Sequence, residues 1–325
     1  MRYTSNNHLL RNTAGILLGL TLWFAVVRCE KTVFFDVDTQ ENMLVVSAVV
    51  QADTSLEVHV TLSIDPLSIG FDPEEVSDAQ VSIYRNGNFI AFMNHTIEGY
   101  YYLDKDVLQA AAGDVIKVEV AAEGHTTAYA ETVIPQEVSI EQVSILDTIF
   151  FPVSYSVIDS FGNYYVIDTV VPHYQLAIDF TDIPGDDFYS LEITYTDAFS
   201  ETYTCFSTSD AAFVLNGDFN LGGTNDDGTI TLCNEAYFND ISFAGEHKRL
   251  IVSLLEIPTE FVVDPQFIIE LNHISTGYYT YLTTSNLQNT NGDNPFSEPV
   301  IIYNNIENGF GILGAVSTST YVLDL

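Results

Sequence analysis

The sequence predicts an all-β chain made of two β-sandwich domains, and three observations support this prediction. From Leu44 onward, short runs rich in β-branched and aromatic residues are separated by turn residues. Several runs alternate apolar and polar residues, as a strand with one buried face does. A single stretch, 275–287, has apolar residues at helical spacing, and Ser275 can cap its start. We therefore expect residues 29–135 to form a sandwich similar to transthyretin-like or immunoglobulin-like modules, and residues 136–325 to form a larger β domain with one short helix.

Five or six strands are expected in the N-terminal domain. The continuous apolar run Leu44–Val50 predicts a strand that is buried on both faces. Asn86 and Gly87 lie between two apolar runs and predict a hairpin with a type I′ turn, because both residues adopt positive φ readily. Pro135 ends the domain, since proline cannot donate to a strand ladder. The expected strands are 44–50, 57–64, 81–84, 89–93, 114–121 and 128–134.

The C-terminal domain is expected to begin with two hairpins. Turn residues at 160–163 and at 183–187 each separate two β-rich runs. Near the end of the chain, the glycine-rich segment 309–315 predicts turns or bulges. The runs of the two hairpins are 153–158, 164–170, 174–180 and 189–195, and the other expected strands are 230–232, 251–255, 267–271, 300–303 and 320–323.

The charge balance excludes one class of partner. The chain has 325 residues, with 9 Lys and Arg against 45 Asp and Glu, which gives a formal net charge of −36. Each phosphate contact needs Lys or Arg, so this balance argues against nucleic acid and against anionic headgroups as partners. Hydrophobic residues make up 47% of the chain, which is enough to bury a real core.

The start of the chain is typical of a secretory signal peptide, which we expect to span residues 1–28. The apolar run Ala14–Val27 is 14 residues long, which is too short for a bilayer span of about 20 residues but suits a signal. Cys29 follows at the place where bacterial lipoproteins are cleaved and diacylated, so acyl chains on Cys29 are expected to tether the protein to a membrane. Arg28 stands where a small residue is usual, and the alternative is an uncleaved signal anchor with Cys29 as an incidental thiol.

Two other cysteines, Cys205 and Cys233, follow in the body of the chain. In an exported protein such a pair is expected to form a disulfide. The alternative is two buried thiols that never meet.

No motif predicts a catalytic residue, a cofactor or a metal ion, and no ligand-binding residue is assigned. The chain lacks the G-x-S-x-G nucleophile motif, and its seven histidines are scattered without metal-ligand spacing. Paired carboxylates could serve a glycosidase or a calcium site, but in so acidic a chain they are more often part of a solvated turn. The pairs are Asp36 with Asp38, Asp186 with Asp187, and Asp226 with Asp227.

Several strings of residues occur together in a specific order. Near the start, Cys29-Glu30-Lys31 precedes Asp36-Val37-Asp38 and Leu44-Val45-Val46; farther along come Glu235-Ala236-Tyr237-Phe238-Asn239-Asp240, Asn294-Pro295-Phe296-Ser297-Glu298-Pro299, Asn304-Asn305-Ile306 and Gly309-Phe310-Gly311-Ile312-Leu313-Gly314-Ala315. In this order they resemble a Bacteroidota lipoprotein family catalogued as domain-of-unknown-function family 4249. The resemblance implies an outer-membrane lipoprotein acylated at Cys29. It also implies a gene that often lies beside a TonB-dependent receptor, and no established enzymatic activity.

These observations favour a non-enzymatic binding or accessory lipoprotein, exported and lipid-anchored in the outer membrane, that works with a TonB-dependent transporter. One alternative is a secreted hydrolase that uses carboxylates, which two buried carboxylates about 5–9 Å apart in a cleft would favour. The other is a structural or adhesive surface protein, which the lack of any concave pocket would favour.

Overall fold

The computed structural model of the protein describes residues 42–64, 72–158, 160–196, 201–214, 225–255, 266–292 and 300–324. Residues Asn42–Leu325 form one compact unit. The expected signal peptide 1–28, Cys29 and the pair Asp36 and Asp38 lie outside the described residues. Within the described ranges, no helix combines the length and the apolar composition needed to cross a membrane.

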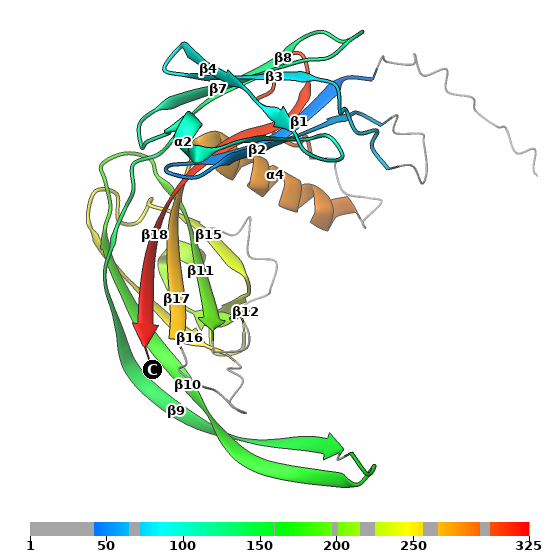
Figure 1. Cartoon of the computed structure of the whole chain (residues 1–325). Coiled ribbons are helices and arrows are strands. Elements are labelled where there is room, and N and C mark those ends of the chain that lie inside the picture. Colours follow the sequence, from blue (N-terminus) through cyan, green and yellow to red (C-terminus); the bar gives the residue numbers. More distant parts are fainter. Residues whose placement is uncertain are drawn as a thin grey trace, which may run out of the picture. The chain divides into compact units, whose positions relative to one another are not determined.

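Three β-sheets account for most of the described chain, which confirms the all-β, multi-sheet prediction (Figure 1). The nine-stranded sheet has the order β12-β11-β17-β18-β1-β2-β6-β5, and β15 pairs with β11. Its strands are β1 Leu44–Gln51, β2 Leu56–Leu62, β5 Asn94–His95, β6 Tyr100–Leu103, β11 Phe188–Thr196, β12 Glu201–Tyr203, β15 Glu235–Asn239, β17 Gln266–Ile274 and β18 Phe310–Asp324.

The other two sheets are smaller. The five-stranded sheet has the order β14-β13-β16-β10-β9, and the four-stranded sheet the order β4-β3-β7-β8. Their strands are β3 Gln80–Arg85, β4 Asn88–Phe92, β7 Val115–Ala121, β8 Ala128–Val133, β9 Ile140–Ile158, β10 Tyr164–Thr181, β13 Phe206–Thr208, β14 Ile230–Leu232 and β16 His247–Leu254. The helices are α2 Lys105–Leu108, α3 Ala211–Val214 and α4 Thr276–Gly292.

The first core lies between the four-stranded sheet and the β1, β2 and β6 strands of the large sheet. The hairpin β3–β4 turns at Asn86 and Gly87, whose φ angles of 52° and 77° confirm the positive φ expected of this turn. The prediction that Leu44–Val50 is buried on both faces is wrong. Side chains of β1 alternate between buried and partly exposed, and Val49 is 37% exposed.

The last strand of the chain completes this first core. β18 pairs in parallel with β1, with Val46 opposite Gly311, and Leu313 and Ala315 of β18 belong to the same cluster as β1. β18 then continues as the antiparallel neighbour of β17, with Val316 opposite Ile274. The segment 309–315, predicted to be turns or bulges, is therefore largely strand. Its glycines allow close approach, since a Cβ on Gly311 would lie 2.0 Å from the carbonyl oxygen of Val46.

The second core forms between the five-stranded sheet and the β11, β15 and β17 strands of the large sheet. The hairpin predicted around 183–187 is wrong, because β10 pairs with β9 and β16 whereas β11 pairs with β12, β15 and β17. Both strands are apolar where they meet, and Ile178 and Leu191 are completely buried in one cluster. The two strands therefore pack face to face in different sheets, and residues 182–187 carry the chain from one layer to the other.

The predicted helix is confirmed as α4, which runs beyond Leu287 to Gly292. The Ser275 side chain does not act as the expected cap, because its Oγ accepts a hydrogen bond from the backbone N–H of Ala315 at 3.1 Å. The predicted strand 300–303 is wrong. That segment lies along α4, where the N–H of Val300 donates to Gln288 Oε1 at 3.0 Å and the N–H of Tyr303 donates to Thr284 Oγ1 at 2.9 Å.

The expected boundary after residue 135 falls between the two cores along the chain. The described members of the first cluster run to Ile134, and those of the second begin at Val138. Ile306 and the start of β18, however, return to the first cluster. The first core is thus built from both ends of the described chain.

Candidate functional site

An open cavity of about 500 Å³ lies where residues from both parts of the chain meet. One side is formed by Glu131–Gln136, the other by Asp186, Asp187 and His273, and the backbone at the start of α4 closes it. Apolar and polar groups both line this cavity, as is usual where a small ligand is oriented by a few polar contacts.

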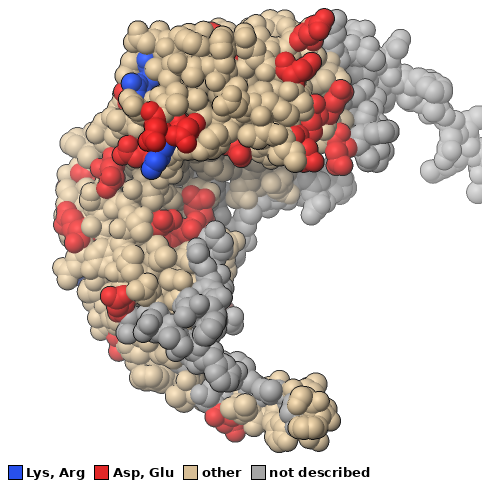
Figure 2. Space-filling view, viewed as in Figure 1, with Lys and Arg blue, Asp and Glu red and all other residues tan. Residues whose placement is uncertain are grey.

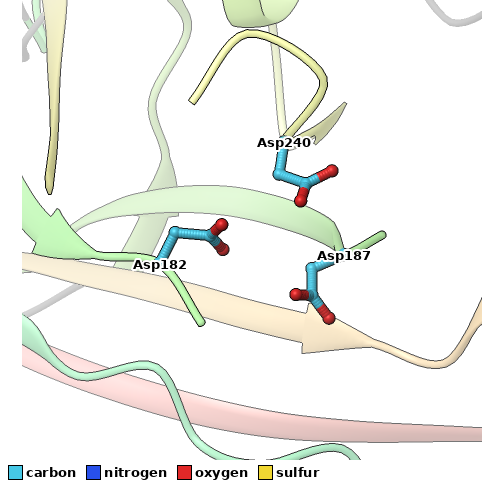
Figure 3. Close-up of side chains that lie close together, drawn as sticks. All are labelled: Asp182, Asp187 and Asp240. Atoms are coloured by element: carbon cyan, nitrogen blue, oxygen red, sulfur yellow. The ribbon is translucent and has the colours of Figure 1, made fainter. Parts of the chain in front are cut away.

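A carboxylate cluster lies beside this cavity and consists of Asp182, Asp187 and Asp240 (Figure 3). Asp182 follows β10 directly, Asp187 precedes β11, and Asp240 follows β15, so the crossover between the layers and the pairing of β15 with β11 bring them together. One oxygen from each carboxylate lies within 4.8 Å of those of the other two.

Two neighbours hold the carboxylate of Asp182, which is 3% exposed. The hydroxyl of Tyr189 donates to its Oδ1, and the backbone N–H of Gly245 donates to its Oδ2 at 2.6 Å. Gly245 has φ +70°, a conformation that L side chains rarely adopt, so a glycine is suited to present this N–H. Burial and the hydrogen bond to Asp182 raise the pKa of Tyr189, which keeps its hydroxyl a donor.

His273 on β17 links Asp187 to the chain that enters the second core. Its Nδ1 lies 2.7 Å from the carbonyl oxygen of Gln136, and its Nε2 lies 2.9 Å from Asp187 Oδ1. A carbonyl oxygen only accepts, so Nδ1 carries a hydrogen. The 2.9 Å contact between Nε2 and Asp187 Oδ1 also needs a hydrogen, which is carried by one of these two atoms.

Burial raises the pKa of Asp187; His273 opposes this shift, and the charge of Asp182 adds to it. Burial also raises the pKa of Asp240, where a backbone hydrogen bond opposes the shift and the charges of Asp182 and Asp187 add to it. The Oδ2 atoms of Asp187 and Asp240 are buried and have no hydrogen-bond partner among the described residues. The cluster therefore holds two buried oxygen atoms whose hydrogen bonding the described part of the chain does not satisfy.

The other acidic pairs singled out in the sequence behave differently. Asp186 is exposed at the rim of the cavity, and only its neighbour Asp187 joins the cluster. Asp226 and Asp227 lie in an exposed turn, where Asp227 Oδ1 accepts from the N–H and the hydroxyl of Thr229 at 3.0 and 2.7 Å. These hydrogen bonds lower the pKa of Asp227. This turn is closed by its own hydrogen bonds, as its sequence suggests.

Sequence reasoning missed Asp182, Asp240 and the role of His273. Each lies at or near the end of a β-rich run, and this position was the only feature of the sequence that could have indicated a site. Their proximity depends on which strands pair, and no local pattern contains that information.

Cys205 and Cys233 are joined by a disulfide, with Cα atoms 4.1 Å apart. Cys205 immediately precedes β13 and Cys233 immediately follows β14, and these strands pair with Phe206 opposite Leu232. The antiparallel register therefore places the two cysteines next to each other at one end of this strand pair.

A second surface feature is the long antiparallel ribbon of β9 and β10. β16 pairs with β10 only from Gln175 to Thr181, so the distal ribbon, 149–173, has no third strand among the described residues (Figure 1). On one side of it five apolar side chains are between 56% and 69% exposed. We call this side the apolar ribbon face, and its members are Phe150, Ile158, Tyr164, Val166 and Val170.

The charged surface is dominated by acids, and Figure 2 shows few basic side chains on the visible face. The described cations are largely engaged. Lys117 lies 2.6 Å from Glu119, Lys248 lies 2.6 Å from Asp210, and Arg249 makes two bonds to Asp179 at 2.7 and 2.9 Å. Acids without basic partners give such a surface a negative potential.

The sequence matches a known protein family. No curated protein matches the chain. The sequence profile described as "Domain of unknown function (DUF4249)" matches residues 30–321, which is most of the chain. The chain therefore belongs to this family of unknown function, as the ordered strings of residues predicted.

Proposed function

We propose that this protein is a non-enzymatic accessory lipoprotein of the cell envelope that docks onto an outer-membrane transporter of the TonB-dependent type through its apolar ribbon face. The observation that carries this proposal is the exposure of five large apolar side chains on one side of a ribbon that no third described strand supports. Soluble proteins rarely gather several large apolar side chains on one exposed face unless a partner covers them. Ser154, Ser156 and Asp168 share this face with the five apolar residues.

A protein partner fits the ribbon better than a lipid bilayer does. Both edges of the distal ribbon, 149–173, lack a further strand among the described residues. In hydrocarbon each unsatisfied backbone N–H or C=O costs several kcal/mol, so an open ribbon does not insert stably. A protein surface offers apolar side chains that can cover the face. The acidic surface adds no attraction to anionic lipid.

The membrane side of the proposal rests on the signal at 1–28 and on acylation of Cys29, which leave the body free to bind its partner. The family resemblance, with genes beside TonB-dependent receptors, supports a transporter as that partner. A hydrolase has less support, because two buried carboxylates in a cleft would favour it. Three acids line the cavity, but two of them, Glu131 and Asp186, are exposed.

Two variants test docking against a matched control. We expect the triple variant Phe150→Ser, Tyr164→Ser, Val166→Ser to lose co-purification of the transporter from cross-linked, detergent-solubilised membranes. The control carries Ile97→Ser, Ile241→Ser and Ile301→Ser, which remove apolar residues that are 63%, 81% and 90% exposed outside the ribbon. Loss of the partner in both variants, or in neither, would contradict docking through this face.

The tether is tested separately. Cys29→Ser is expected to move the protein from the membrane fraction to the soluble fraction while the purified protein still binds detergent-solubilised transporter. Retention of Cys29→Ser in membranes that lack the transporter would refute the acyl anchor without affecting the ribbon result.

A further inference from the structure

We propose that the carboxylate cluster of Asp182, Asp187 and Asp240 is a Ca²⁺ site. One oxygen of each carboxylate lies within 4.8 Å of the other two. Oxygen ligands of Ca²⁺ lie at about 2.3–2.6 Å, so ligands on opposite sides of the ion are about 4.6–5.2 Å apart. A single ion between the three side chains would therefore lie near an oxygen of each, and Figure 3 shows that the three side chains lie close together.

Two oxygen atoms point to a ligand independently of this proximity. Asp240 is 3% exposed, and its Oδ2 has no hydrogen-bond partner among the described residues; the same holds for Oδ2 of Asp187. Buried polar atoms in folded proteins are nearly always paired, because an unpaired one loses its hydration without compensation. A cation at the centre of the cluster would satisfy both atoms at once.

The cluster offers carboxylate oxygens, which are the ligands that hard divalent cations take. The supporting contacts leave ligand positions open, since His273 uses only Oδ1 of Asp187 and a carboxylate oxygen accepts more than one contact.

The donor set distinguishes Ca²⁺ from other common metals. Zinc favours nitrogen and sulfur ligands, and both nitrogens of His273 already contact oxygen atoms. Mg²⁺ keeps several waters and usually binds through one or two carboxylates, whereas Ca²⁺ takes six to eight oxygens in flexible geometry. Three carboxylates on loops and strand ends, with water or backbone oxygens to complete the shell, suit Ca²⁺.

Such an ion would add a direct link between three segments that the large sheet already brings together. They are the crossover 182–187, the turn that begins at Asp240, and the end of β17 through His273. Asp187 and His273 also line the cavity, so the bound ion would fix one of its walls.

The test uses the purified protein after treatment with a chelator. CaCl₂ is titrated by calorimetry, and thermal unfolding is followed with and without the ion. We expect saturable 1:1 binding, a higher Tm with Ca²⁺, and at least tenfold weaker binding of Mg²⁺. Equal or tighter binding of Mg²⁺ would overturn the assignment to Ca²⁺.

Asp240→Asn is the decisive variant, with Asp226→Asn as its control. Both substitutions remove one negative charge, but Asp226 lies in the exposed turn outside the cluster. We expect Asp240→Asn to weaken Ca²⁺ binding at least tenfold and to abolish the Tm increase, while Asp226→Asn keeps both. The ion-free Asp240→Asn protein should be at least as heat-stable as the ion-free parent, because it loses a buried repulsive charge.

The Tm of ion-free Asp240→Asn also shows whether this variant is folded. A Ca²⁺-dependent Tm increase that is equal in parent and Asp240→Asn, no increase in either, or loss of the effect in Asp226→Asn alone would each overturn the site. A lower Tm of Asp240→Asn without ion, with Ca²⁺ binding unchanged, would show that the cluster is a purely structural carboxyl network.

Discussion

Replacing Gly311 by alanine tests whether the C-terminal strand is an integral part of the first core. A Cβ at this position would lie 2.0 Å from the carbonyl oxygen of Val46 and 2.9 Å from its carbonyl carbon, within the parallel pairing of β18 and β1. Both atoms belong to the backbone, so the strands must separate by about 1 Å or more to restore normal contact distances. Overpacking of this kind typically costs about 1–3 kcal/mol.

The backbone conformation adds a second contribution. Gly311 has φ +115°, and a non-glycine residue at positive φ costs about 1–2 kcal/mol. We therefore expect Gly311→Ala to lower the free energy of unfolding by about 2–5 kcal/mol in urea denaturation followed by far-UV circular dichroism. It should also accelerate proteolysis at the C-terminal strand.

Gly87→Ala is the matched control, because Gly87 has φ +77° and no heavy atom lies within 4 Å of a Cβ placed there. It should lose only the conformational part, about 1–2 kcal/mol, with an unchanged m value. Equal losses in the two variants would refute the close approach of β18 to β1.

Three further predictions concern separate contacts. A Cβ on Gly314 would lie 2.6 Å from Cγ of Tyr278, so Gly314→Ala should push α4 away from β18, lower the free energy of unfolding by about 1–3 kcal/mol and increase proteolysis of α4. The disulfide closes a loop between residues 28 positions apart, so reduction should lower the free energy of unfolding by about 3–4 kcal/mol. Reduction should also change the gel mobility of the parent protein but not that of Cys205→Ser. The hydrogen bond from Lys117 lowers the pKa of Glu119 in the folded protein. The ionised carboxylate therefore stabilises the fold at pH values above the unfolded pKa of Glu, and this stabilisation is lost as the pH falls through the folded pKa. Glu119→Gln should therefore destabilise by less than about 1 kcal/mol at about pH 7 and by nothing measurable below about pH 3, as urea denaturation at each pH would show.

Local turn chemistry explains the part of the fold that could be predicted. Asn86 and Gly87 adopt positive φ within a few residues of sequence, and the turn at Gly162, with φ 83°, is determined in the same way. The turn around 183–187 contains similar residues but connects two layers, because β10 and β11 each find other partners. Composition at a turn does not reveal whether the strands beside it pair with each other.

The candidate site could not be predicted for a related reason. Asp182, Asp187 and Asp240 come together only through the crossover and the pairing of Ser190 with Tyr237 between β11 and β15. In a chain with 45 acids, a few more at strand ends give no signal. The start of β18 was missed because glycine usually marks a turn, whereas Gly311 here allows two backbones to approach closely.

The edges of the distal ribbon are protected from pairing with other strands, whereas its apolar ribbon face is exposed. This combination favours docking over nonspecific aggregation. Pro152 lies opposite Val170 and Pro172 lies opposite Phe150, so each strand lacks one backbone donor that a further strand would need. Natural proteins use proline in this way to stop exposed strands from pairing with other chains. Protection of the edges does not by itself require an apolar face. Replacing Tyr164 and Val166 by Ser or Thr would keep the ribbon and make this face more polar. The presence of apolar side chains on that face therefore supports the proposed docking.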